Sequence, residues 1–326
     1  MKQIITTACL LFITVCGAQI NFVKHADLLL NAHRAKELKD AKKALSLYEE
    51  AFALHSDNSI GDYLYAANCA AQLNNKTSCE KWIIEAIQTK KVEKKSILKF
   101  SENEIYQRCA TKILLKYPVY LSKYYKNLEN PMAYFKIQEL INRDQFSRKI
   151  NDYHFGVSDA EKEEAYEGFL KSQAPKDSVA RRKYQSILFP KVSKVHEEYK
   201  LKIKRYTDSL NLVSLMDITR DYGWQKEGWL LLWHQRGYYG KKNWVWNYFK
   251  PFIDNEIKEG TISPSFWAQF EDFKSIRETG KSIYGYHPGK VDASTVNKKR
   301  KSIGLPVLTK AEITHRNNNP YGGRLF

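Results

Sequence analysis

Apolar and polar residues follow one another along this chain with a helical period. Between residues 26 and 90, small or apolar side chains recur at steps of three and four, as on a half-buried helix. The same period returns over residues 102–117, before Pro118, and over 132–151, where Pro131 suits a first helical turn. No stretch alternates with period two, the pattern of a half-buried strand. The chain is therefore predicted to be all-α.

Further helices are predicted in the C-terminal half. A long basic helix covers residues 191–215 or beyond and stops near Gly223, which suits a left-handed cap. Residues 228–236 and 244–259 form two more apolar helical segments. From Gly280 onwards glycine and proline become frequent, which predicts a turn-rich C-terminal tail.

A small–large–small pattern marks an internal repeat. The first copy is Ala44, Tyr48 and Ala51, and Cys79, Ile83 and Ala86 stand at the same spacing 35 residues later. The segment 26–90 resembles tetratricopeptide repeats, whose unit is a helix–turn–helix of about 34 residues. In that family the small residues let two antiparallel helices approach closely. The resemblance implies helix pairs that offer a groove to a protein partner, although Ser56 stands where the family usually has proline.

The first eighteen residues have the pattern of a signal peptide. Lys2 gives a positive start, residues 4–15 are almost wholly apolar, and Cys16-Gly17-Ala18 supplies the small residues of a cleavage site before Gln19. The apolar run is too short to span a bilayer, and no later segment is long enough. In the alternative lipoprotein interpretation Cys16 would be acylated, but Val15 disfavours it. We expect an exported protein, periplasmic or secreted, without a transmembrane segment after cleavage.

The chain is strongly basic, with a formal net charge of +17. Such a charge favours anionic neighbours, namely nucleic acid, acidic lipid head groups or acidic polysaccharide. Export disfavours nucleic acid, so an anionic component of the cell envelope is the expected partner of this charge. Because the positive residues are scattered, a general surface charge is the simpler explanation.

Three cysteines remain after cleavage, at Cys69, Cys79 and Cys109. The tetratricopeptide resemblance places Cys69 and Cys79 opposite one another within one helix pair, where a disulfide could join them. Three buried small hydrophobic side chains are the default expectation.

Short motifs in the C-terminal half occur in a shared order. They are Asp144-Gln145-Phe146-Ser147-Arg148, Asp208-Ser209-Leu210-Asn211, Tyr222-Gly223-Trp224, Trp229 through His234-Gln235, Gly280 through Gly285, and Asn297 through Leu308 with Arg300 inside it. Together they resemble a bacterial exported domain family of unknown function over residues 130–310. The resemblance implies a helical domain but no reaction.

The chain departs from that family's pattern in three ways. The apolar helix ends in His234-Gln235, the reverse of the usual order, and the family's acidic position falls on either Glu271 or Asp272. The long gap after Arg148 predicts an insertion at about 152–190, with a helix start at Ser158.

His234 is the residue best suited to take part in a chemical step. A histidine near neutral pH can move protons or bind metal, but at a helix end it can also satisfy the last carbonyls. A candidate pocket would combine His234, Asp272 and Tyr284 with the ligand-binding candidates Gln145, Arg148, Gln235 and His287. Gln145 and Arg148 share one helical face. The histidine and cysteine spacings predict no metal site, and no motif predicts a cofactor.

The aromatic and basic segment 237–250 has two interpretations. It could be a stacking surface for sugars or bases, or the core face of a helix. Trp244, Tyr248 and Phe252 fall on one helical stripe and are predicted to face the core, leaving Trp246 and Lys250 on another side.

The predicted organisation is a signal peptide at 1–18, tetratricopeptide-like repeats at 19–125 and a helical domain at 126–326. The favoured hypothesis is an interaction or scaffold protein of the cell envelope. The alternative is a hydrolase or small-ligand-binding domain with a polar pocket around His234. The hydrolase would draw its carboxylates from Asp208, Glu271 or Asp272.

Overall fold

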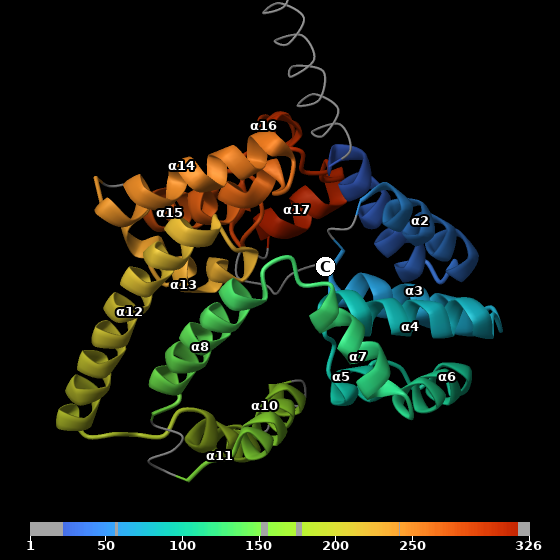
Figure 1. Cartoon of the computed structure of the whole chain (residues 1–326), viewed down its shortest axis with the longest axis horizontal. Coiled ribbons are helices and arrows are strands. Elements are labelled where there is room, and N and C mark those ends of the chain that lie inside the picture. Colours follow the sequence, from blue (N-terminus) through green and yellow to red (C-terminus); the bar gives the residue numbers. More distant parts are fainter. Residues whose placement is uncertain (1–21, 56–57, 151–155, 174–177, 241, 319–326) are drawn as a thin grey trace, which may run out of the picture. The chain divides into compact units, whose positions relative to one another are not determined.

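The computed structural model of the chain is almost entirely helical (Figure 1). It describes residues 22–55, 58–150, 156–173, 178–240 and 242–318, so the predicted signal peptide lies outside the described residues. The chain divides into two compact units, one of residues 1–131 and 236–326, and one of residues 132–235. We refer to them as unit 1 and unit 2. The predicted boundary at 125/126 lies close to the start of unit 2, whereas residues 236–326 cluster with the N-terminal residues.

Unit 1 begins with adjacent helices packed in pairs. Residues 22–37 are helical, and six helices follow: α2 (Ala41–Leu54), α3 (Ile60–Gln72), α4 (Lys76–Lys90), α5 (Lys94–Lys99), α6 (Glu104–Leu114) and α7 (Tyr117–Lys126). α2 packs on α3, α3 packs on α4, and α4 packs on α6 and α7. Pro118 opens α7 in its first turn instead of ending the preceding helix, which stops at Leu114.

The residues of the repeat pattern form the core of these helix pairs. Ala44, Tyr48 and Ala51 are fully buried, and so are Cys79, Ile83 and Ala86 in the second copy. The small side chains bring neighbouring helix backbones close, and the large ones fill the space between pairs. The structure thus confirms the predicted burial and the packed helix pairs.

Polar caps hold these helices in register. Ser59 and Asp62 form a reciprocal capping box at the start of α3. Asp62 also lies 2.9 Å from His33 Nε2, and the other ring nitrogen of His33 lies 2.9 Å from the Tyr48 hydroxyl oxygen. One carboxylate therefore links three consecutive helices.

The three cysteines are buried free thiols. Cys79 lies near Cys109, across the contact between α4 and α6. Burial, the first cause, and this thiol neighbour both raise the pKa of Cys79. The pair brought together is thus Cys79 with Cys109, and the three thiols serve as the small core side chains that were the default expectation.

The second stretch of unit 1 starts with a short 3-10 helix at Arg236–Tyr238. Its other elements are α14 (Trp244–Glu259), a 3-10 helix at Pro264–Trp267, α15 (Ala268–Thr279), β1 (Lys281–Ser282), β2 (Lys290–Val291), α16 (Val296–Ser302) and α17 (Lys310–Asn318). β1 and β2 form a minimal parallel pair and are the only strands in the described residues. The tail beyond Gly280 is rich in turns, as predicted, and carries two short helices. Arg34 binds Glu312 on α17 at 2.9 Å, which joins the two stretches of unit 1.

Unit 2 is built on two long helices and a helical hairpin. Its elements are α8 (Pro131–Arg148), α10 (Asp159–Gln173), α11 (Ser178–Leu188), α12 (Lys194–Tyr222), a 3-10 helix at Lys226–Gly228 and α13 (Trp229–Trp233). α12 ends at Gly223, whose φ of +76° explains the glycine predicted there.

The predicted insertion forms the hairpin of α10 and α11. Ser158 and Glu161 form a capping box at its start, in agreement with the predicted helix start. A Cβ atom at Gly168 would lie 2.3 Å from the Tyr184 ring, so glycine is needed for the two helices to pack.

Within the described residues, no helix is both long and apolar enough to cross a membrane.

Candidate functional site

Three of the motifs meet around one buried carboxylate in unit 2. Asp144, near the end of α8, is fully buried. Arg148 donates to both of its oxygens at 2.7–3.0 Å, Gln145 Nε2 donates to Oδ2 at 2.8 Å, and His234 Nε2 lies 3.2 Å from Oδ2. Arg148 also binds Asp208 on α12 at 2.8 Å. Of the predicted pocket residues, Gln145, Arg148 and His234 therefore come together.

The pKa values of the two carboxylates in this cluster, Asp144 and Asp208, are shifted in opposite directions. Burial alone would raise the pKa of Asp144, but its hydrogen bonds to His234 and Arg148 outweigh burial and lower the pKa to about 2. Burial raises the pKa of Asp208 above its ordinary value despite the nearby Arg148. Asp144 therefore stays ionised at neutral pH and fixes the guanidinium and the imidazole in place. This is the geometry of a polar network that holds α8, α12 and the end of α13 together.

A second buried carboxylate organises the turn after α15 in unit 1. Asp272 is fully buried and accepts hydrogen bonds from five groups. They are the backbone N–H groups of Ile283, Tyr284, Tyr286 and His287, at 2.5–3.2 Å, and the Ser282 hydroxyl at 2.5 Å. All five donors belong to residues 282–287, so Asp272 is the anchor of its own turn.

The final motif closes over the same turn. Arg300 on α16 is buried and donates to the Tyr284 carbonyl oxygen at 2.6 Å. Burial lowers the pKa of this guanidinium to about 10. Asn297 exchanges two hydrogen bonds of 2.8 Å with the backbone of Leu308. The Gly280–Gly285 motif and the Asn297–Leu308 motif are thus neighbours in space.

The predicted pocket residues consequently divide between the two units. Gln145, Arg148 and His234 lie in unit 2, with Gln235 half-buried after α13, whereas Asp272, Tyr284 and His287 lie in unit 1. His287 is half-buried, and its backbone takes part in the turn around Asp272. Asp144 was missed as a site residue, although it begins the first motif.

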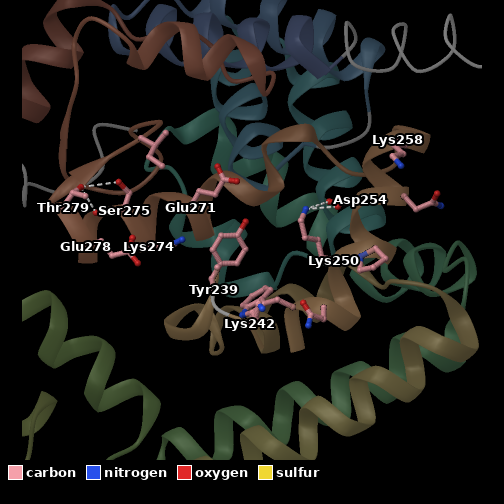
Figure 2. Close-up of a pocket in the computed structure, with 16 residues that line it drawn as sticks. Tyr239, Lys242, Lys250, Asp254, Lys258, Glu271, Lys274, Ser275, Glu278 and Thr279 are labelled. Carbon is pink, nitrogen blue, oxygen red and sulfur yellow. Dashed lines mark hydrogen bonds and ion pairs between the residues drawn. The ribbon is translucent and has the colours of Figure 1, made fainter. Parts of the chain in front are cut away.

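A pocket of about 1200 Å³ opens in unit 1 between α14 and α15 (Figure 2). Its aromatic lining is Tyr239 and the buried Trp246, and its charged lining is Lys242, Lys250, Asp254, Lys258, Glu271, Lys274 and Glu278. The uncharged polar groups come from Asn247, Asn255, Ser275 and Thr279. The volume exceeds the roughly 300–1000 Å³ of a typical small-molecule site, and aromatic walls with convergent polar groups are characteristic of such sites.

The wall of the pocket from α14 corrects the predicted core face. Trp244 is 54% exposed, whereas Trp246, Phe249 and Ile253 are buried. The buried stripe packs on the aromatic side chains that precede and begin α15, with Trp246 and Phe270 ring centroids 5.1 Å apart. This contact selects one of two similar helical stripes. The same orientation of α14 places Trp246 and Lys250 at the pocket.

Glu271 is held at the pocket by Tyr284 and lies near Tyr239. The Tyr284 hydroxyl donates to Glu271 Oε2 at 2.6 Å. The charge of Glu271 also acts on the nearby Tyr239 phenol. Burial and this carboxylate both raise the pKa of each phenol, so both remain protonated donors at neutral pH. Figure 2 shows Tyr239, Glu271 and Lys274 grouped on one side of the pocket.

The lysines of the pocket differ in their partners. Lys250 pairs with Asp254 at 2.7 Å, and Asp254 also accepts from Trp267 Nε1 at 2.8 Å. Within the described part of the chain, Lys242, Lys258 and Lys274 have no carboxylate within ion-pair distance. Lys274 is half-buried, and its ammonium lies so close to Gly240 that a Cβ atom there would be 2.5 Å from Nζ.

No sequence motif predicted Tyr239 and Lys274 as pocket residues. Two sequence features could have indicated them. One is the basic and aromatic composition of residues 237–250, and the other is the spacing of Glu271 and Lys274, which puts both on one face of a helix. Among the described residues, no three His, Cys, Asp or Glu side chains gather as a metal site.

Comparison with protein families, with curated proteins and with solved structures gives no match to this chain. The packed helix pairs are compatible with helical repeats, and the resemblance to an exported domain family rests on the motifs alone.

Proposed function

We propose that this protein is an exported small-ligand-binding protein whose binding site is the pocket between α14 and α15. The observation that carries the proposal is the lining of that pocket. An aromatic wall, a carboxylate fixed by the Tyr284 hydroxyl and an unpaired half-buried lysine converge on one space large enough for a small molecule. The interaction hypothesis rests on the helix pairs alone, and the His234 cluster has its central carboxylate saturated by protein donors. The pocket therefore supports ligand binding better than either alternative.

Filling the pocket tests this function. Asn247 is an exposed residue of the lining, so Asn247→Trp is expected to occupy part of the space without disturbing the core. A ligand that binds only the folded protein raises its melting temperature in proportion to the logarithm of its concentration. A panel of anionic, neutral and cationic small metabolites, screened by thermal shift and confirmed by calorimetry, should yield saturable binding to wild type. We expect affinity to fall at least about tenfold in Asn247→Trp, because each lost 1.4 kcal/mol is a factor of ten.

Lys310→Trp is the matched control, because Lys310 is an exposed residue of unit 1 outside the lining. It should bind like wild type. If every binder retains its affinity in Asn247→Trp, the pocket is not the binding site. If the whole panel is silent, the ligand-binding function is wrong.

Export is the second part of the proposal. Its support is the apolar run at 4–15 followed by Cys16-Gly17-Ala18. Expression with secretion-competent cells followed by N-terminal sequencing of the mature protein should give Gln19 as the first residue. A mature protein that begins at Met1 would contradict export.

A further inference from the structure

The charges that line the pocket are unevenly satisfied. Lys250 and Asp254 neutralise one another, and Glu271 accepts a hydrogen bond from the Tyr284 hydroxyl. Lys274 remains as a half-buried cation with no carboxylate partner in the described residues. Because an unpaired charge in a partly buried place is costly, this lysine is best matched by a negative group on the ligand.

Next to Lys274 lies Glu271, a carboxylate that can accept further hydrogen bonds. A carboxylate has about four lone-pair sites, and the Tyr284 hydroxyl occupies one of those of Glu271. The remaining sites need hydrogen-bond donors. A ligand hydroxyl supplies one without adding a second negative charge beside Glu271.

The residues of α15 that line the pocket alternate between hydrogen-bond acceptors and donors. Glu271, Lys274, Ser275 and Glu278 lie three, four and seven residues apart, so they share one helical face and present acceptor, cation, hydroxyl and acceptor in turn. Figure 2 shows Glu271, Lys274, Ser275 and Glu278 following one another along this wall. A matching ligand carries one acid group among several hydroxyls.

The remaining wall is aromatic. Tyr239 is half-buried and offers part of its ring to the pocket, and the buried Trp246 packs behind it with ring centroids 5.1 Å apart. The C–H face of a sugar ring can lie against Tyr239. Phosphate-rich ligands fit less well, because Glu271 and Glu278 would repel a multiply charged group.

We propose that the pocket binds an acidic saccharide, with a uronic-acid carboxylate on Lys274, ring hydroxyls on Glu271 and a sugar ring against Tyr239. This inference rests on the proposed ligand-binding function. The volume of about 1200 Å³ admits the end of an oligosaccharide as well as a single sugar.

Calorimetry with the full mature chain tests the ligand class. The probes are digalacturonic acid, the neutral disaccharide of galactose, and inorganic pyrophosphate, each titrated at low and at physiological salt. Digalacturonic acid should bind at least about tenfold more tightly than the neutral disaccharide, and its affinity should fall with salt. Lys274→Gln keeps the length and polarity of the side chain and should reduce digalacturonate affinity about tenfold while leaving the neutral sugar unchanged.

Lys310→Gln is the control for a general loss of positive charge, and it should bind digalacturonate like wild type. Equal affinity for the acidic and the neutral disaccharide, no binding of digalacturonate, or no effect of Lys274→Gln would each overturn the inference. If pyrophosphate or another panel compound binds instead and loses affinity in Asn247→Trp, ligand binding at the pocket survives and only the saccharide class is wrong.

Discussion

Replacing Asp272 by alanine is expected to cost at least about 4 kcal/mol of unfolding free energy. The carboxylate is fully buried and receives four backbone N–H groups and one hydroxyl. Alanine leaves those donors buried without acceptors, and each unmade bond of this kind costs about 1–3 kcal/mol. The contributions are not additive, which is why the expected loss is smaller than their sum. Urea unfolding followed by far-ultraviolet circular dichroism measures the loss.

Two variants calibrate that result. Asp272→Asn keeps one acceptor oxygen and should fall between wild type and alanine. Asp292→Ala removes an exposed carboxylate that caps a turn in the same unit, and should cost about 1 kcal/mol. Should Asp272→Ala unfold at the urea concentration of Asp292→Ala, the carboxylate is not what holds the turn.

Replacing Asp144 by asparagine is expected to destabilise unit 2 by about 3 kcal/mol. The change removes the charge that pairs with Arg148 and His234 inside the protein, and breaking one side of a buried ion pair costs about 3–5 kcal/mol. Arg148 keeps Asp208 as a second partner, which places the expectation at the lower end. Asp217→Asn is the control, since Asp217 pairs with Arg220 on the exposed side of α12 and should cost less than about 1 kcal/mol.

The pH dependence of the same variant has a defined sign. The folded-state pKa of Asp144 is lowered to about 2 from an ordinary value of 3.8. Its ionisation therefore stabilises the protein fully above pH 4, and the contribution disappears as the pH falls through about 2. Asp208 has a raised pKa and acts in the opposite direction, so the two partly cancel. Wild type should lose about 2 kcal/mol more than Asp144→Asn between pH 5 and pH 2. Parallel acid-unfolding curves for the two proteins would contradict the role of Asp144.

Helix positions were predictable where the period was strong. Residues 244–259 were predicted as a helix and form α14 with those bounds, and the stop of α12 at Gly223 followed from the glycine alone. The face of α14 was not predictable in the same way. The stripe of Trp244 and Tyr248 and the stripe of Trp246 and Phe249 are equally aromatic, and only contact with Phe270, outside the helix, decides which one is buried.

The site was predictable as a set of residues but not as a set of contacts. The motif order led to Gln145, Arg148 and His234, yet nothing local says that Asp144 is the centre on which they converge. The choice between Glu271 and Asp272 depends on which of two adjacent side chains turns inward. In the structure Asp272 lies under the turn and Glu271 faces the pocket, a difference of one position on the helix.

The salt bridge between Arg34 and Glu312 has a consequence for the order of folding. Unit 1 consists of two stretches separated by all of unit 2, so this contact closes a loop of most of the chain. Contacts of such long sequence separation form late and slow folding, because the loop entropy must be overcome first. A chain emerging from its N-terminus must therefore keep its first helix pairs together by contacts between neighbours alone, which is the kind of stability that repeat arrays have. The N-terminal pairs can then act as the template on which the last ninety or so residues complete unit 1.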